Sequence, residues 1–246
     1  MRSDVGERTL LGVLTPSSNT VVEPLTAAML RGLDDVTAHF TRFRVREISL
    51  RAEALRQFDL GPILDAAALL ADARVASIVW SGTSAGWLGF ETDEALCRAI
   101  TGATGIPAGS SVLALNEIFR ATGVRRFGLV TPYLDEIQAR IVDTYARAGF
   151  ACVAERHLGD PGNFSFSEVS EATVAGMIRE VAAERPDAIT VFCTNVRGAA
   201  VVAAMEEETG IPIHDTVATG LWKGMKLAGA DPARVRGYGR LFQEAA

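Results

Sequence analysis

The hydrophobic and polar positions of the chain form a repeating pattern of short apolar runs followed by helical spacing. Continuous apolar runs are typical of parallel strands that are covered on both faces, and apolar residues three and four apart are typical of amphipathic helices. The pattern predicts strands at 9–14, 36–46, 75–80, 105–107, 126–130, 151–154, 188–192 and 210–213. It predicts helices at 22–29, 63–70, 94–100, 111–119, 134–148, 174–181, 201–208 and 216–227. Strands that alternate with helices in this way predict an α/β fold with parallel sheets.

Three segments of this pattern occur twice, in the same order. The matching pairs are 12–16 with 128–132, 79–83 with 191–194 when a one-residue gap is allowed, and 104–107 with 209–212. The gapped pair places Gly82 opposite Cys193. A repeat of about 110 residues is too long for a solenoid and predicts two homologous lobes.

We therefore expect two Rossmann-like, flavodoxin-like lobes related by a pseudo-twofold axis. The first lobe is predicted to comprise residues 1–116, completed by the C-terminal helix in 217–246, and the second residues 117–216. Ligands of open α/β sheets bind outside the carboxyl ends of the strands, so the site is expected in the cleft between the lobes.

Composition narrows the classes of function. The 246 residues are 48% hydrophobic and 22% charged, which is ordinary for a globular protein, and the net charge of −6 predicts no nucleic-acid partner. No apolar run reaches the roughly 18 residues of a membrane span, and the charged N-terminus lacks the apolar core of a signal peptide. These features predict a cytoplasmic protein without a membrane partner. Its three scattered cysteines are then expected to be reduced thiols that hold no metal.

Small polar residues follow the predicted strands in both lobes, and none of them is a carboxylate. They are Pro16, Ser17, Ser18, Asn19, Gly82, Thr83 and Ser84 in the first lobe, and Thr131, Tyr133, Cys193, Thr194 and Asn195 in the second. Neutral donors and helix N-termini suit an anion, so a small carboxylate is the expected ligand.

Cys193 ends a predicted strand and precedes a helix, where a thiol can be activated. The alternative is a small apolar residue that caps a buried strand. Ser17 and Thr20 are most simply interpreted as helix caps, and Ser111 as the cap of the helix that runs to Phe119. The segment 161–165 is predicted to form a loop over the cleft from which Asn163 contacts the substrate.

The run Pro16-Ser-Ser-Asn-Thr20, the Thr131-Pro-Tyr133 loop, the Gly82-Thr-Ser84 loop and the Cys193 loop together resemble the aspartate/glutamate racemase superfamily. The nearest branch is that of maleate isomerases and arylmalonate decarboxylases, and the resemblance extends over nearly the whole chain. It implies a two-lobed α/β enzyme that needs no metal or organic cofactor, and a homodimer. It also implies one catalytic cysteine from each lobe in the racemases and isomerases.

This chain departs from that two-cysteine pattern because Gly82 stands where the first cysteine is expected. Arylmalonate decarboxylases resemble it in this respect, with one cysteine in the second lobe. The resemblance implies that Thr83, Ser84, Tyr133 and the Thr194 amide bind the developing enediolate and that Cys193 donates the proton. It also matches Asn19 to a carboxylate-binding position of the isomerase branch. Substrate binding is further expected, from their places in the loops around the cleft, of Pro16, Ser17, Gly82, Asn163, Thr194 and Asn195.

Three functions are therefore compatible with the sequence. The first is decarboxylation of a small, substituted malonate-type dicarboxylate through an enediolate that Cys193 protonates. The second is a maleate-type cis–trans isomerase or a racemase of the same superfamily. The third is a two-lobed carboxylate-binding protein without catalysis.

Overall fold

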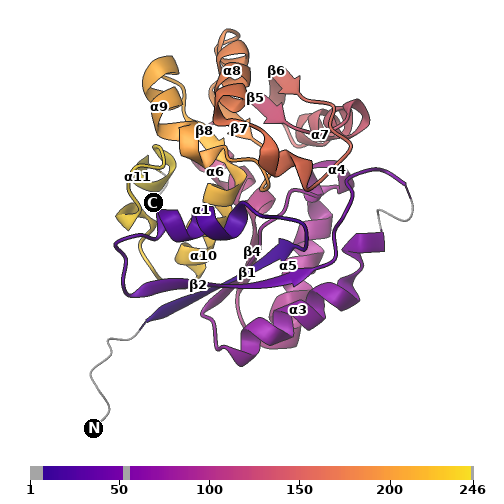
Figure 1. Cartoon of the computed structure of the whole chain (residues 1–246), viewed down its shortest axis with the longest axis vertical. Coiled ribbons are helices and arrows are strands. Elements are labelled where there is room, and N and C mark those ends of the chain that lie inside the picture. The colour runs from indigo at the N-terminus through magenta and orange to yellow at the C-terminus, as the bar shows by residue number, and fades with distance from the viewer. Residues whose placement is uncertain (1–7, 52–55, 245–246) are drawn as a thin grey trace.

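Two parallel four-stranded sheets form the frame of the molecule (Figure 1). The computed structural model describes residues 8–51 and 56–244. The first sheet has the order β2-β1-β3-β4 and the second the order β6-β5-β7-β8, and we call the halves built on them lobe one and lobe two. The strands are β1 (Thr9–Pro16), β2 (Val36–Phe43), β3 (Ser77–Trp80), β4 (Ala108–Ser110), β5 (Arg126–Thr131), β6 (Ala151–His157), β7 (Ala188–Val191) and β8 (Ile213–Asp215). The predicted two-lobed parallel α/β fold is confirmed.

Helices connect the strands in each lobe, as the 3.6-residue spacing predicts (Figure 1). In lobe one they are α1 (Val22–Met29), α3 (Leu60–Asp72), α4 (Ala85–Leu88), α5 (Phe90–Thr104) and α6 (Ser111–Ala121). In lobe two they are α7 (Asp135–Arg147), α8 (Glu171–Ala182) and α9 (Ala199–Thr209). The chain ends with α10 (Thr216–Leu227) and α11 (Leu241–Glu244), and 3-10 turns lie at Arg56–Phe58, Ser165–Glu168 and Pro232–Arg234.

The two sheets repeat each other at the level of single hydrogen bonds. In lobe one Leu14 is the partner of Trp80, and the amide of the following residue, Ser81, donates to the Leu14 carbonyl at 2.9 Å. In lobe two Val130 is the partner of Val191, and the next amide donates to the Val130 carbonyl at 2.8 Å. Trp80 therefore corresponds to Val191, and counting onward Gly82 corresponds to Cys193. The gap predicted from the sequence is wrong, although it gave the right partner for Gly82.

Several predicted boundaries also change. The strands expected at 105–107 and 210–213 begin later, at Ala108 and Ile213, because the preceding prolines have no N–H to donate to a ladder. The strand expected to reach residue 46 ends at Phe43. The hydroxyl of Ser110, one residue before the predicted cap, accepts from the Leu113 amide at 3.1 Å and caps α6.

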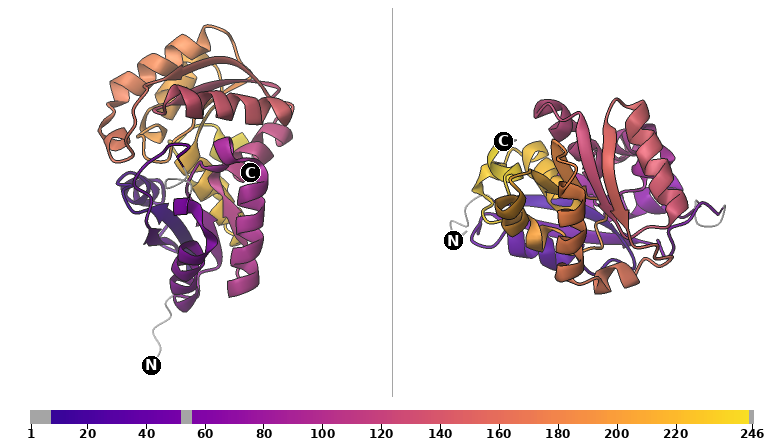
Figure 2. Two further views of the ribbon diagram at one scale, coloured as in Figure 1. Left: turned by 90° about the vertical axis from the view of Figure 1, so that its right-hand side faces the viewer. Right: turned by 90° about the horizontal axis from the view of Figure 1, so that it is seen from above.

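The lobes are joined by close packing and by a return of the chain (Figure 2). A Cβ on Gly86 of α4 would lie 2.6 Å from the Phe192 ring, so glycine allows α4 to rest on lobe two. After β8 the chain crosses back, and α10 packs on α6 and β3 of lobe one. A buried cluster there contains residues from both ends of the chain and from α6: Leu11, Val22, Met29, Ile118, Leu221, Trp222, Leu241 and Phe242.

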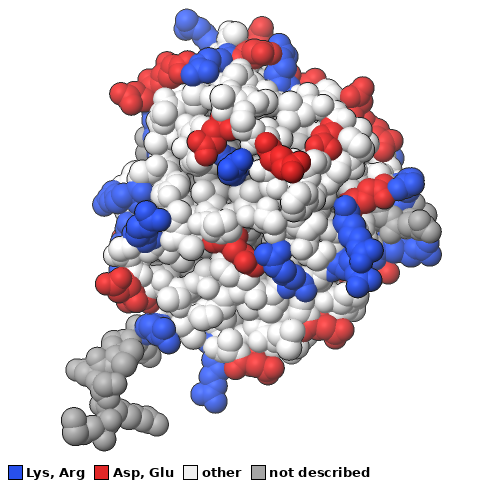
Figure 3. Space-filling view, viewed as in Figure 1, with Lys and Arg blue, Asp and Glu red and all other residues white. Residues whose placement is uncertain are grey.

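On the face shown in Figure 3, Lys and Arg are interspersed with Asp and Glu. Among the described residues, no helix combines the length and apolar character needed to cross a membrane.

Candidate active site

A small buried pocket lies where the carboxyl ends of β1, β3, β5 and β7 face each other. It gathers every residue predicted to be catalytic or to bind substrate except Ser17. Of the other strand-end residues, Ser18 and Thr131 do not line it, and their hydroxyls donate to the Val45 carbonyl at 2.8 Å and to Gln138 Oε1 at 2.7 Å. The lining comprises Pro16, Asn19, Val45, Ile48, Phe58, Trp80, Gly82, Thr83, Ser84, Trp87, Tyr133, Asn163, Cys193, Thr194 and Asn195. Ser17 is exposed, and its hydroxyl pairs instead with the backbone N–H and C=O of Val45 at 3.2 and 3.3 Å. Its predicted role in substrate binding has no support from this position.

The polar side of the pocket is built across the two lobes. The Tyr133 hydroxyl lies 2.6 Å from Thr83 Oγ1, so one hydroxyl donates to the other across the cleft. Both side chains are buried. Burial and the nearby Cys193 raise the pKa of Tyr133 well above 10, so its hydroxyl keeps its proton and serves as a donor.

Cys193 is 3% exposed at the centre of this arrangement. Burial raises the pKa of its thiol to about 12, although hydrogen bonds from the Tyr133 hydroxyl and the Asn195 and Val196 amides favour the thiolate and oppose that rise. The negative field of the Asp215 carboxyl adds to the rise. The resting thiol is therefore protonated, and donors already surround the sulfur where a thiolate would form once the proton is given up.

The other two cysteines lie outside the pocket. Cys97 is half-buried in α5, where burial and the nearby Asp93 raise its thiol pKa to about 12. Cys152 is half-buried in the edge strand β6, and burial raises its thiol pKa to about 12 as well. Among the three thiols, Cys193 alone can meet a ligand in this pocket.

Several side chains predicted to bind substrate also hold the lobes together. Asn19 Nδ2 donates to the carbonyl oxygen of Thr194 at 3.0 Å and lies 3.3 Å from its hydroxyl. Asn195 accepts from the Thr20 amide at 3.0 Å and donates to the Asn163 carbonyl at 2.6 Å. Asn163 Nδ2 in turn donates to the Ser18 hydroxyl at 2.9 Å. We call this set of bonds the interlobe latch.

The side chain of Asn19 also caps the start of α1. Its Oδ1 accepts from the Val21 and Val22 amides, both at 2.9 Å, which satisfies two of the free N–H groups at the helix start. The caps predicted at Ser17 and Thr20 are therefore wrong. One asparagine fixes the loop after β1, the start of α1 and the contact with lobe two.

An apolar wall faces the polar side, and the residues that form it were not predicted from the sequence. It consists of Val45, Ile48, Phe58, Trp80 and Trp87. Three of these residues belong to the connection between β2 and α3, which carries no strand-end motif. The Trp87 indole N–H is buried without a hydrogen-bond partner in the described structure, so it is a spare donor at this wall.

The pocket is nearly closed in this structure. Its volume is about 20 Å³, which is room for about one water molecule. A dicarboxylate is larger, so its entry requires the wall or the latch to move.

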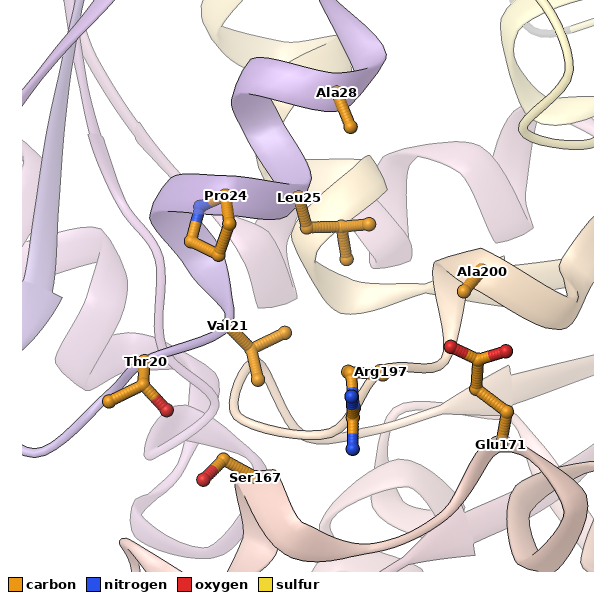
Figure 4. A pocket seen from close by; sticks show the side chains of 9 residues that line it. All are labelled: Thr20, Val21, Pro24, Leu25, Ala28, Ser167, Glu171, Arg197 and Ala200. Atoms are coloured by element: carbon orange, nitrogen blue, oxygen red, sulfur yellow. The ribbon is translucent and has the colours of Figure 1, made fainter.

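A more open groove of about 390 Å³ lies beside the latch (Figure 4). Val21, Pro24, Leu25 and Ala28 form one side of it, and Ser167, Glu171, Arg197 and Ala200 the other. Arg197 is exposed and lines this groove, outside the pocket that holds Cys193.

The family model and the relatives that match this chain place it in the aspartate/glutamate racemase superfamily, in the branch of maleate isomerases and arylmalonate decarboxylases. The family model described as arylmalonate decarboxylase matches residues 11–242, so the chain belongs to the arylmalonate decarboxylase family.

Individual relatives agree with this assignment. Arylmalonate decarboxylase of Bordetella bronchiseptica is 30% identical over 185 residues, which cover 74% of this chain and 77% of the relative. The crystal structure of maleate isomerase Iso from Pseudomonas putida S16 has a TM-score of 0.89 at 24% identity, covering 97% of this chain and 99% of the other. A cysteine-to-serine mutant of Nocardia farcinica maleate cis–trans isomerase, with a covalently bound succinylcysteine intermediate, has a TM-score of 0.86 at 24% identity, covering 98% and 100%. The chain is thus an enzyme. Its family contains decarboxylases, and maleate isomerases share its fold.

Proposed function

We propose that this enzyme removes one carboxylate of a substituted malonate without a cofactor and that Cys193 protonates the resulting enediolate. The observation that carries the proposal is the state of the thiol. A buried thiol with a pKa raised to about 12 is an acid at neutral pH, and the donors around it are ready to hold the thiolate.

The two sides of the pocket suit the two carboxylates of a malonate. Thr83, Ser84 and Tyr133 supply neutral donors for the carboxylate that is retained, and the apolar wall faces the other. A carboxylate against apolar side chains loses its hydration, and its conversion to neutral carbon dioxide relieves that cost.

The electron balance is simple. The bond between the α-carbon and the departing carboxylate breaks, its electron pair moves into the retained carboxylate, and an enediolate forms. Donors placed where this charge develops stabilise it, and each contributes about 3–4 kcal/mol by analogy with other oxyanion sites. The Cys193 S–H then donates its proton to the α-carbon, and a proton from solvent restores the thiol.

Maleate isomerization is the alternative, and the resemblance of the Pro16–Thr20 run to the isomerase branch and the structural similarity to maleate isomerases favour it. The succinylcysteine of the Nocardia farcinica mutant shows a thiol bonded to the substrate carbon in that protein. The same step here requires a Cys193 thiolate before substrate reacts. The raised pKa of Cys193 opposes that state, so the decarboxylase is the better-supported function.

Proton NMR in D₂O distinguishes the candidates. The enzyme is incubated with 2-methyl-2-phenylmalonate, unsubstituted malonate, maleate and aspartate, with Cys193→Ala as control. Loss of carbon dioxide with one deuteron at the α-carbon supports the proposal, and conversion of maleate to fumarate contradicts it. Saturable binding of these compounds without turnover would instead support a carboxylate-binding protein.

A decarboxylase also predicts a specific pH dependence. The thiol acts in its protonated form, which persists until the pH approaches a pKa of about 12. We expect kcat/KM to show no fall from thiol ionisation between about pH 6 and pH 10, whereas a thiolate mechanism would gain activity as pH rises through this range.

A further inference from the structure

The indole ring of Trp80 occupies the space beside Gly82. A Cβ built on Gly82 would lie 2.0 Å from Trp80 Cζ2, 2.4 Å from Cε2 and 2.6 Å from Cη2. Carbon atoms in contact prefer about 3.5–4.0 Å, so no side chain fits at position 82 while the ring keeps this place. Gly82 does not have the positive φ that would demand glycine, so the ring is the obstacle to a side chain.

The ring is held firmly where it is. Trp80 is 1% exposed and is the last residue of β3, between β1 and β4. Its ring packs on Phe43 with centroids 4.9 Å apart and an interplanar angle of 42°. Displacing it would disrupt both this contact and the apolar wall of the pocket.

Lobe two shows what the same backbone accommodates without the ring. Val191 stands at the position equivalent to Trp80, and Cys193 at the position equivalent to Gly82. Side chains two residues apart in an extended chain point to the same side. A small valine therefore leaves room for the cysteine, whereas a tryptophan takes that room.

We infer that Trp80 is a specificity-determining residue that closes the lobe-one face of the reacting carbon, so that a proton can arrive only from Cys193. This inference rests on the proposed decarboxylation, because the closed face matters only if an α-carbon is protonated between the lobes. It predicts a single-handed product. It also predicts that a second thiol at position 82 cannot act unless Trp80 is replaced as well.

A test by protein stability needs no substrate. The melting temperatures of the wild type, Gly82→Cys, Trp80→Val and the double variant form a cycle in which Trp80→Val copies the lobe-two residue. We expect Gly82→Cys to lower the melting temperature in the wild-type background and to lower it much less, or to raise it, in the Trp80→Val background. Gly102→Cys in α5, where a Cβ meets nothing within 4 Å, is the control and should shift both backgrounds equally. Equal shifts for Gly82→Cys in both backgrounds would overturn the inference.

A second test follows the chemistry. Enantiopure 2-phenylpropionate is incubated in D₂O, and loss of optical purity is measured. Racemization requires a thiolate on one side to take the α-proton and a thiol on the other side to return one, with the roles exchanged in the reverse direction. We expect the double variant to racemize this acid at least about 100-fold faster than either single variant. The inference would be overturned if Gly82→Cys alone racemized the acid as fast as the double variant, or if the double variant were inert with an intact fold.

The two proposals can fail separately. If the wild type decarboxylates no malonate, the proposed function fails while the stability cycle still reports whether Trp80 excludes a side chain at position 82. If the wild type decarboxylates but the cycle shows no coupling, the proposed function stands and the role of Trp80 falls.

Discussion

The ends of β3 and β7 are equivalent in their backbone pairing but carry different side chains. In lobe one the last strand residue and the loop after it are Trp80-Ser-Gly-Thr-Ser84, and in lobe two they are Val191-Phe-Cys-Thr-Asn195. Lobe one contributes the large Trp80 ring and Gly82, which has no side chain. Lobe two contributes the acidic thiol of Cys193. A repeated fold thus supplies two equivalent places beside one substrate, and a pair of side chains in each place decides which of them can react.

The largest effect is expected where the lobes differ most. Cys193→Ala makes the two strand ends alike in lacking an acid, and we expect turnover to fall by roughly 10²–10⁴-fold. Cys97→Ala is the matched control, since that thiol lies outside the pocket. Equal activity of the two variants in the NMR assay would show that lobe two does not supply the proton.

The donor that connects the lobes comes next. Tyr133→Phe removes the hydroxyl that pairs with Thr83 and supports the sulfur, and kcat is expected to fall by about 10²-fold. Tyr145→Phe is its control because that buried hydroxyl has no hydrogen-bond partner in the described structure and lies outside the pocket. A similar loss in both variants would indicate general damage to the fold.

The helix caps after β4 and β8 give a third comparison. Ser110 caps α6 in lobe one, and the equivalent Asp215 caps α10 by accepting from the Val217 and Ala218 amides at 2.8 and 3.2 Å. Burial raises the pKa of Asp215 from 3.8 to about 7. The folded protein therefore binds this proton more tightly than the unfolded chain, and its stabilising contribution is lost as the pH rises through about 7.

Asp215→Ser should remove this pH-dependent loss of stability while a hydroxyl still caps α10. Between about pH 5 and pH 8 we expect the free energy of unfolding to fall by about 2 kcal/mol less in the variant than in the wild type. Urea unfolding at the two pH values measures this difference. An unchanged pH dependence would mean that Asp215 stays ionised in the folded protein. Asp93, whose pKa burial also raises to about 7, continues to titrate in both proteins.

The last comparison concerns the latch. Asn195→Ser copies Ser84, its lobe-one equivalent, and removes the bonds to the Thr20 amide and the Asn163 carbonyl. We expect a loss of about 1–3 kcal/mol in the free energy of unfolding, measured with urea. Ser84→Ala is the control, since this hydroxyl makes no capping bond on α4. An equally large loss of stability in the control would show that the latch bonds are not its cause.

Much of the fold was predictable because local patterns carry it. Continuous apolar runs and helical spacing identified the strands and helices, and repeated short segments revealed two lobes. Errors fell at boundaries, where one residue decides: the prolines before β4 and β8, and the cap at Ser110 in place of Ser111. Such details depend on hydrogen bonds that periodicity does not encode.

The sequence by itself determined the fold class, the repeat, and the meeting of Gly82 and Cys193 at one cleft. It could do so because parallel strands end at the same edge of a sheet, which turns chain order into spatial order. Only the tertiary structure decided that Asn19 caps α1 while binding lobe two, that residues from the β2–α3 connection form an apolar wall, and that the Trp80 ring fills the space beside Gly82. These contacts join residues from separate elements, and they follow from the volumes and rotamers of packed side chains, which no local pattern along the chain expresses.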